Sequence, residues 1–229
     1  MLERYMREFI GYGNLEAPLW FLGLEEAGSR SSDDLFRRVD AWTAYGCNAV
    51  VDLVQFHDRL GIEHLFGDRP KIQATWRRLI QIALVSQGEE VNPESIARFQ
   101  ATRLGRLDGE NLLGELLPLP KATTRSWPYG DLAERHSFLR TRRQYQRHLV
   151  PIRVALLREA IRSYQPRTVI FYGTTRRRLW EQIAETSLAD NEVGFAYAKS
   201  HASQYLLVKH PNARGVSGSY YDAAARSVS

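Results

Sequence analysis

Two short segments place chemically useful side chains directly after apolar runs. In the first, Glu25 and Glu26 follow the apolar run 18–24 and precede Gly28. Carboxylates at the end of a buried strand are partly desolvated yet within reach of a substrate, a setting that suits general acid–base catalysis. In the alternative interpretation, both acids are solvated turn residues or cap the following helix.

The second segment has the sequence His-Pro-Asn-Ala-Arg and follows the apolar run 205–209. Pro211 makes the exit from this run rigid, so His210 and Asn212 are placed to hydrogen-bond a ligand. Arg214 projects from the turn that follows. A single histidine is more often structural, so this segment becomes informative only in combination with the acidic one.

Positive charge is concentrated in one part of the chain. Residues 135–178 contain 12 arginines, no lysine and one acid, a net charge of +11, whereas the whole chain carries +5. Arginine suits bidentate contacts with phosphate and stacking on bases, so a basic face on an otherwise acidic body predicts contact with nucleic acid or nucleotides. A GC-rich genome would explain the preference for arginine over lysine, but not its clustering.

The elements that would position these residues are four short apolar runs, 18–24, 112–119, 168–172 and 205–209. Their apolarity is continuous rather than alternating, which indicates strands covered on both faces, as in a parallel sheet between helices. The sequence therefore predicts an α/β fold, a three-layer α/β/α sandwich with a four-stranded, mainly parallel sheet. Ligands of such folds bind at the carboxyl edge of the sheet.

Helical periodicity fills the intervals between these runs. In 145–164, apolar residues recur at spacings of three and four, with Pro151 expected near the helix start and Pro166 after its end. Residues 29–108 show helical patterns at 35–58, 73–86 and 93–104. We interpret them as a helical insertion within one domain that spans 1–229, because the stretch is too long for a simple crossover and too apolar for a linker.

In their order along the chain, the segments resemble the uracil-DNA glycosylase superfamily. Members of that family have an acidic or amide residue in a glycine-containing turn after the first strand, and a His-Pro-Ser turn after the last. Here Gly23-Leu24-Glu25-Glu26 stands at the first place and His210-Pro211-Asn212-Ala213 at the second. Residues 156–175 and 112–120 resemble the family's penultimate unit and second strand, whereas the insertion 29–108 has no counterpart.

The resemblance implies hydrolysis of the N-glycosidic bond of a deaminated or damaged base that is swung out of DNA, a DNA-repair reaction. Glu25, or Glu26 if the turn is shifted by one residue, would orient water or stabilise the positive charge that grows on the sugar. His210 would hydrogen-bond the departing base. Asn212 would contact phosphate, and Arg214 would fill the gap left in the base stack.

The same resemblance suggests residues that bind the base. The family reads the base with an asparagine of the second strand; Glu115 is the nearest match here, and Asn111 lies four residues earlier. An ionised Glu115 accepts hydrogen bonds but does not offer an amide's donor, so the target base stays open. Gly23 belongs to this set through its motif, and Trp127 and Phe36 are candidates for stacking on the base, with core packing as the alternative for Phe36.

Cations at the start of the helix after 168–172 oppose the helix dipole, so binding of phosphate explains them better than local helix stability. The alternative is a solvated helix whose arginines pair with distant acids. The candidate nucleic-acid-binding residues of this basic region are Thr174, Arg176, Arg177, Arg178, Arg142 and Arg143.

Other observations limit the class of protein. A single cysteine, Cys47, excludes a disulfide framework and thiolate clusters. The six histidines lack paired ligand spacing, and no nucleotide-binding glycine motif occurs, so we expect no metal and no cofactor. Residues 1–9 are charged and no apolar run has membrane-spanning length, so we expect a cytoplasmic protein, most simply a monomer, without membrane contact.

Three functions therefore compete. The first is a uracil-DNA-glycosylase-like enzyme that acts on DNA, single- or double-stranded. The second is a catalytically silent module that binds nucleic acid or nucleotides on the same fold. The third is an enzyme that acts on free nucleosides or nucleotides, for which a basic face would be needed less.

Overall fold

The fold is seen in a computed structural model that describes residues 1–28, 31–121 and 127–228. Its centre is a parallel sheet of β4 (Asn111–Lys121), β2 (Leu19–Ala27), β5 (Thr168–Tyr172) and β8 (Ser203–Val208), in that spatial order. These are the four predicted strands, and the α/β class is confirmed. Their carboxyl ends lie at one edge because all four run in the same direction.

The prediction of a four-stranded sheet is wrong, because the sheet has eight strands in the described part of the chain. On the β4 side lie β1 (Gly11–Gly13) and β3 (Val50–Val51), and on the β8 side lie β7 (Ala196–Ser200) and β6 (Ala189–Asp190). β1 runs antiparallel to β4, and β7 antiparallel to β8. Each added strand is at most five residues long, so its pairing depends on a distant strand edge rather than on a local apolar pattern.

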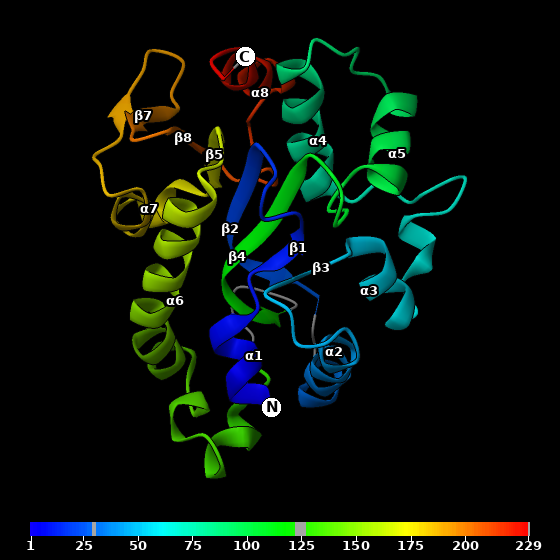
Figure 1. The fold of residues 1–229 in the computed structure, drawn as a ribbon, viewed down its shortest axis with the longest axis vertical. Coiled ribbons are helices and arrows are strands. Elements are labelled where there is room, and N and C mark those ends of the chain that lie inside the picture. The colour runs from blue at the N-terminus through cyan, green and yellow to red at the C-terminus, as the bar shows by residue number, and fades with distance from the viewer. Residues whose placement is uncertain (29–30, 122–126, 229) are drawn as a thin grey trace.

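Helices cover both faces of the sheet (Figure 1). On one side lie α6 (Arg142–Tyr164) and α7 (Arg177–Ala184), and on the other α3 (Leu53–Arg59), α4 (Ala74–Ser86) and α5 (Pro93–Thr102). The remaining helices are α1 (Leu2–Glu8), α2 (Ser32–Ala44) and α8 (Gly218–Arg226), and the 3₁₀ turns are η1 (Glu63–Leu65), η2 (Gly130–Glu134), η3 (Ser137–Leu139) and η4 (Thr174–Arg176). None of the helices described is long and apolar enough to cross a membrane.

Residues 31–108 are largely helical, as predicted, but one of the three expected helices is divided. The expected helix 35–58 is interrupted after α2, where Gly46 and Cys47 adopt left-handed φ angles of 79° and 56°. The chain then forms β3 before α3 begins. Side chains of these helices are buried together with those of the sheet, for example Leu35, Phe56 and Leu79.

Helix α6 begins earlier than its apolar pattern indicated. Thr141 caps it by accepting a hydrogen bond from the Gln144 amide, and Gln165 ends it in a left-handed conformation before Pro166. Pro151 consequently lies inside the helix rather than near its start. Because proline has no N–H, the Arg147 carbonyl has lost the donor that the helix would have provided.

Arg153 of α6 joins three parts of the fold. Its buried guanidinium donates to the carbonyls of Leu116 at 3.0 Å and Glu115 at 2.8 Å in β4, and to that of Arg7 at 3.1 Å, at the end of α1. Burial without a carboxylate partner lowers the pKa of Arg153 to about 10. The three carbonyls together hold one face of the central sheet against α1 and α6.

Replacing Arg153 should therefore destabilise the whole domain. We expect Arg153→Met to lower the free energy of unfolding by about 3 kcal/mol, because carbonyls that lose a charged donor stay buried. Urea denaturation measures this difference. Arg158→Met, which removes a half-buried arginine of the same helix and its 3.6 Å ion pair with Glu185, is the matched control and should cost less than about 1 kcal/mol. Equal losses in the two variants would contradict this role of Arg153.

Candidate functional site

Glu25 and Glu26 belong to the end of β2 rather than to a turn, because the strand continues to Ala27. They point toward different partners. The Glu25 side chain is 6% exposed and lies between two cations, with Arg142 Nη2 at 3.0 Å and Lys121 Nζ at 3.1 Å. It is therefore enclosed by ion pairs on the α6 side of the sheet.

Glu26 lies in a second polar cluster. Its carboxylate receives hydrogen bonds from Arg38 at 2.9 and 3.2 Å and from the Tyr12 hydroxyl at 2.9 Å, and His57 Nε2 lies 3.7 Å away. Burial by itself raises the pKa of Glu26, but the Arg38 charge, with His57 and Tyr12, outweighs burial and lowers the pKa to about 2. Glu26 is consequently ionised at neutral pH, with 20% of its side chain exposed.

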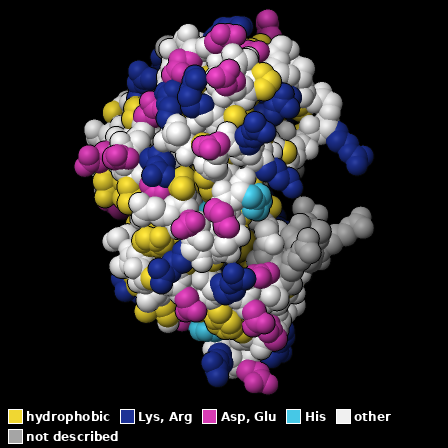
Figure 2. Space-filling model, turned by 90° about the vertical axis from the view of Figure 1, so that its right-hand side faces the viewer, with side chains coloured by type: hydrophobic (Ala, Val, Ile, Leu, Met, Phe, Trp, Pro, Cys, Tyr) yellow, Lys and Arg dark blue, Asp and Glu magenta, His cyan; other side chains and the backbone are white. Residues whose placement is uncertain are grey.

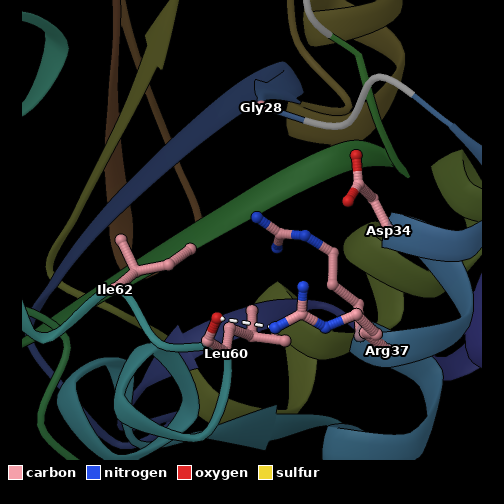
Figure 3. A pocket seen from close by; sticks show the side chains of 6 residues that line it. Gly28, Asp34, Arg37, Leu60 and Ile62 are labelled. Atoms are coloured by element: carbon pink, nitrogen blue, oxygen red, sulfur yellow. Dashed lines mark hydrogen bonds between the residues drawn. The ribbon is translucent and has the colours of Figure 1, made fainter.

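A small hollow adjoins this cluster (Figure 3). Gly28, Asp34, Arg37, Leu60 and Ile62 line it together with Arg38, and Arg37 donates to the Leu60 carbonyl at 3.1 Å. Its volume is about 130 Å³. Sites for ligands of nucleotide size are usually at least twice as large, so this hollow does not suit a base.

A third acid, Glu115, lies beside Gly23 in the centre of the sheet. Gly23 pairs with Glu115 of β4, and Tyr172 of β5 donates from its hydroxyl to Glu115 Oε1 at 2.8 Å. The two side chains meet across β2 because residue 23 has no side chain. A Cβ on Gly23 would collide with the Tyr172 hydroxyl and with Glu115 Oε2.

Glu115 is protonated at neutral pH. Desolvation raises its pKa to about 8, and the nearby charges of Glu26 and Glu25 act in the same direction, whereas the hydrogen bond from Tyr172 opposes them. Its Oε2 atom is buried and has no hydrogen-bond partner among the described residues. A neutral carboxyl group has both a donor and an acceptor, so Glu115 offers the same pair of hydrogen-bonding functions as an amide.

Tyr172 also connects Glu115 to His210, since the rings of Tyr172 and His210 lie 5.8 Å apart in an edge-on arrangement. The His210 Nδ1 atom accepts a hydrogen bond from the Asn212 amide at 3.1 Å, which places the proton of the neutral ring on Nε2. Partial desolvation lowers the pKa of His210. Asn212 in turn donates to the Thr75 hydroxyl at 3.0 Å, so this loop is held against α4.

Tyr172 and His210 line a hollow of about 490 Å³ at the carboxyl edge, a volume within the range of small-molecule sites. We call it the histidine hollow. Figure 2 shows one face of the molecule, on which Lys and Arg side chains lie among Asp and Glu side chains. The residues that line the histidine hollow are Leu24, Tyr172, Gly173, Thr174, Thr175, Arg176, Lys209, His210, Ala213, Arg214, Gly215 and Val216.

The predicted phosphate-binding arginines fall into two groups. Arg142 is occupied by Glu25, and Arg177 is occupied by Glu181 at 3.0 Å and Asp190 at 2.8 Å. In contrast, Arg143, Arg176 and Arg178 are exposed and have no ion-pair partner within 1–28, 31–121 and 127–228. Thr174 and Arg214 are exposed at the histidine hollow.

Three candidates for base binding lie in other surroundings. Asn111 is buried at the amino end of β4, where it accepts from the Gly105 amide and donates to the Arg103 carbonyl. Trp127 packs on Tyr129 and Tyr145 and donates to the Leu139 carbonyl, whereas Phe36 is 40% exposed on α2. None of the three lines the histidine hollow, so the structure brings only Gly23 and Glu115 of the predicted set to its neighbourhood.

Sequence reasoning missed several residues of the site. Tyr172 ends an otherwise apolar run, and its hydroxyl was the only signal of a polar role. Arg38, His57 and Tyr12 come from three separate elements, so nothing local marked them as partners of Glu26. Lys121, one of four lysines in the chain, ends β4 and was equally unmarked.

Among the residues that the structure describes, no group of three or more His, Cys, Asp or Glu side chains is arranged to hold a metal ion. Comparison with known protein families and with curated proteins finds no match to this chain. The fold and the site are therefore interpreted from their own geometry.

The Glu26 cluster should make stability depend on acid pH. Because the folded-state pKa of Glu26 is depressed, its contribution is present above about pH 4.5 and is lost as the pH falls toward 2. We expect Glu26→Gln to lower the free energy of unfolding by about 3 kcal/mol at pH 7, with the difference from the parent shrinking below pH 4. Urea denaturation from pH 2 to 7 measures it, and a difference independent of pH would contradict the assignment.

Glu115 should act in the opposite sense. Because its folded-state pKa is raised to about 8, its contribution to stability is complete below about pH 4.5 and is lost as the pH rises through 8. The Glu115→Gln side chain resembles the protonated acid. We expect its free energy of unfolding, relative to that of the parent, to be about 4 kcal/mol higher at pH 9 than at pH 4. Tyr172→Phe should move the parent's transition to higher pH, since the hydroxyl stabilises the ionised form. A parent whose stability does not fall between about pH 4.5 and 8 would contradict the prediction.

Proposed function

We propose that this chain is a uracil-DNA-glycosylase-like protein that binds DNA, takes one unstacked base into the histidine hollow and hydrolyses its N-glycosidic bond. One observation carries the proposal: Tyr172 and His210 line a hollow large enough for a base, and Tyr172 also hydrogen-bonds the buried Glu115. Arg176, Lys209 and Arg214 on the rim of this hollow supply positive charge for phosphates. We include in this proposal that the α/β fold is the three-layer α/β/α sandwich of this class.

In this proposal Glu115 reads the base. As a neutral acid it donates from one oxygen and accepts at the other, which removes the objection that a carboxylate lacks an amide's donor. Its donor favours a base that presents a carbonyl oxygen, and deamination creates such a carbonyl. Gly23 allows the contact between Glu115 and Tyr172, because a Cβ at position 23 would collide with both side chains.

In the proposed reaction His210 and Glu26 have separate roles, and Glu26 is not one of the residues that line the histidine hollow. Water adds its hydroxyl to the sugar C1′ while the glycosidic bond breaks, and the departing base takes up a proton. His210 Nε2–H stabilises the negative charge on the base, a role for which a neutral ring is suited. Of the two acids of β2 we assign the stabilising of the sugar cation to Glu26, because Glu25 is shared by two cations and is less exposed.

A catalytically silent module that binds nucleic acid is the second candidate. The observation in its favour is that both acids of β2 are neutralised by cations, Glu25 by Arg142 and Lys121 and Glu26 by Arg38. A carboxylate held in this way is a weaker base toward water. This candidate keeps the hollow and its positive rim, and it differs from the first only in the absence of bond cleavage.

Single-turnover base release separates the two candidates. The substrates are labelled oligonucleotides, single- and double-stranded, that carry uracil, hypoxanthine or xanthine. We expect release by the parent, a loss of about 100-fold or more in Glu26→Gln, and a loss of about 10- to 100-fold in His210→Ala. Glu94→Gln, which changes an exposed acid of α5, is the control and should release the base at the parent's rate.

One result would contradict the enzyme assignment, and another would contradict the role given to Glu26. Absence of release from every substrate, with salt-sensitive DNA binding intact, would support the silent module. Release that is lost in Glu25→Gln but retained in Glu26→Gln would transfer the catalytic role to Glu25. Thermal unfolding of each variant at the assay pH distinguishes loss of activity from loss of the fold.

A further inference from the structure

A second hollow adjoins the histidine hollow on the α6 side of η4. Its volume is about 600 Å³, again within the range of ligand sites. We call it the helix hollow. The two hollows share Leu24, Thr174, Thr175 and Arg176, so the single turn η4 forms the wall between them.

The helix hollow combines an apolar floor with a positive rim. Val150 of α6 and Leu179 of α7 contribute apolar surface, and the buried Leu117 of β4 lies beneath them. The rim carries Arg147 and Arg178, both exposed and without an ion-pair partner in the described ranges. An apolar floor with cations at its edge suits a flat aromatic ring attached to an anionic group.

Hydrogen-bonding groups are also available in the helix hollow. Gln146 lines it, and its side chain makes no hydrogen bond to the rest of the described chain. Pro151 lines it as well, and because proline lacks an N–H, the Arg147 carbonyl one turn earlier has lost its helical donor. The Gln146 amide has a donor and an acceptor and is a group that can read the edge of a base.

The wall between the hollows is short and polar. A 3₁₀ helix rises about 2 Å per residue, so the three residues of η4 span only about 6 Å. The side chains of Thr174, Thr175 and Arg176 are exposed and make no hydrogen bond or ion pair within the part of the chain that the structure describes. They are consequently free to bind a phosphate that passes over the wall.

We propose that the helix hollow binds the base of the nucleotide adjacent to the one whose base enters the histidine hollow, with the intervening phosphate on Thr174, Thr175 and Arg176. The ligand is thus a dinucleotide unit of a single strand. In a duplex the neighbouring base stays stacked and paired, so two separate hollows are useful only for an unpaired strand. This inference rests on the proposed binding of DNA but not on cleavage.

Binding of short oligonucleotides tests the inference. The probes are 2′-fluoro-deoxyuridine oligonucleotides of one to four nucleotides with a 5′ phosphate, in which the electron-withdrawing fluorine slows glycosidic cleavage. We expect the second nucleotide to raise the affinity of the parent at least tenfold and the third and fourth to add little, because stacking and one phosphate are gained only once. A duplex that contains the same nucleotides should bind more weakly than the single strand.

Two variants test whether the affinity gained with the second nucleotide comes from the helix hollow. Val150→Trp fills the helix hollow and Arg147→Ala removes its rim charge, and both should reduce the dinucleotide's affinity toward that of the mononucleotide while leaving the mononucleotide unchanged. Arg98→Ala, which removes an exposed arginine of α5 on the other face, is the matched control and should change neither affinity. Thermal unfolding verifies that each variant is folded.

The outcomes separate this inference from the function on which it rests. A dinucleotide that binds no better than a mononucleotide, or a gain untouched by Val150→Trp and Arg147→Ala, would overturn the second subsite while DNA binding stands. If no oligonucleotide of any length binds, both the proposed function and the inference fail. Base release without a dinucleotide gain would support the enzyme and reject the single-strand subsite.

Discussion

The contact between Glu115 and Tyr172 across Gly23 is the constraint on which the site depends. It requires three adjacent parallel strands in one register, with a glycine, Gly23, on the middle strand. The hydrogen bond holds the Tyr172 ring in place, and that ring borders His210 and the histidine hollow. Any larger residue at position 23 would separate the acid from the hydroxyl and displace the wall of the hollow.

Electrostatics gives the acids of this edge different states. Glu26 is ionised because Arg38 outweighs the effect of burial, whereas burial of Glu115 outweighs the Tyr172 hydrogen bond and the Arg153 charge, so Glu115 keeps its proton. Such a difference between the pKa values of neighbouring carboxyl groups is typical of sites where one acid donates a proton or hydrogen bond and the other carries negative charge. The proposed division of labour, with Glu115 reading the base and Glu26 facing the sugar cation, follows from these environments rather than from residue type.

The arginine-rich segment 135–178 contributes both to the structure and to the proposed ligand binding. Arg153 holds backbone carbonyls in the interior, and Arg142 and Arg177 neutralise acids. Arg147, Arg176 and Arg178, in contrast, border two connected hollows without partners in the described structure. A charge count along the sequence includes both groups, so the net charge of 135–178 overstates the positive surface that a nucleic acid would meet.

The sequence by itself determined the four central strands and most of the helices, because continuous apolar runs and helical periodicity are local signals of burial. It also indicated the edge at which Glu25, Glu26 and His210 would lie. Only the tertiary structure decided the short outer strands, the enclosure of Glu25 and the pairing of Glu115 with Tyr172. These features depend on contacts between residues far apart in the chain, and a protonation state depends on burial and neighbouring charge, neither of which a single sequence displays.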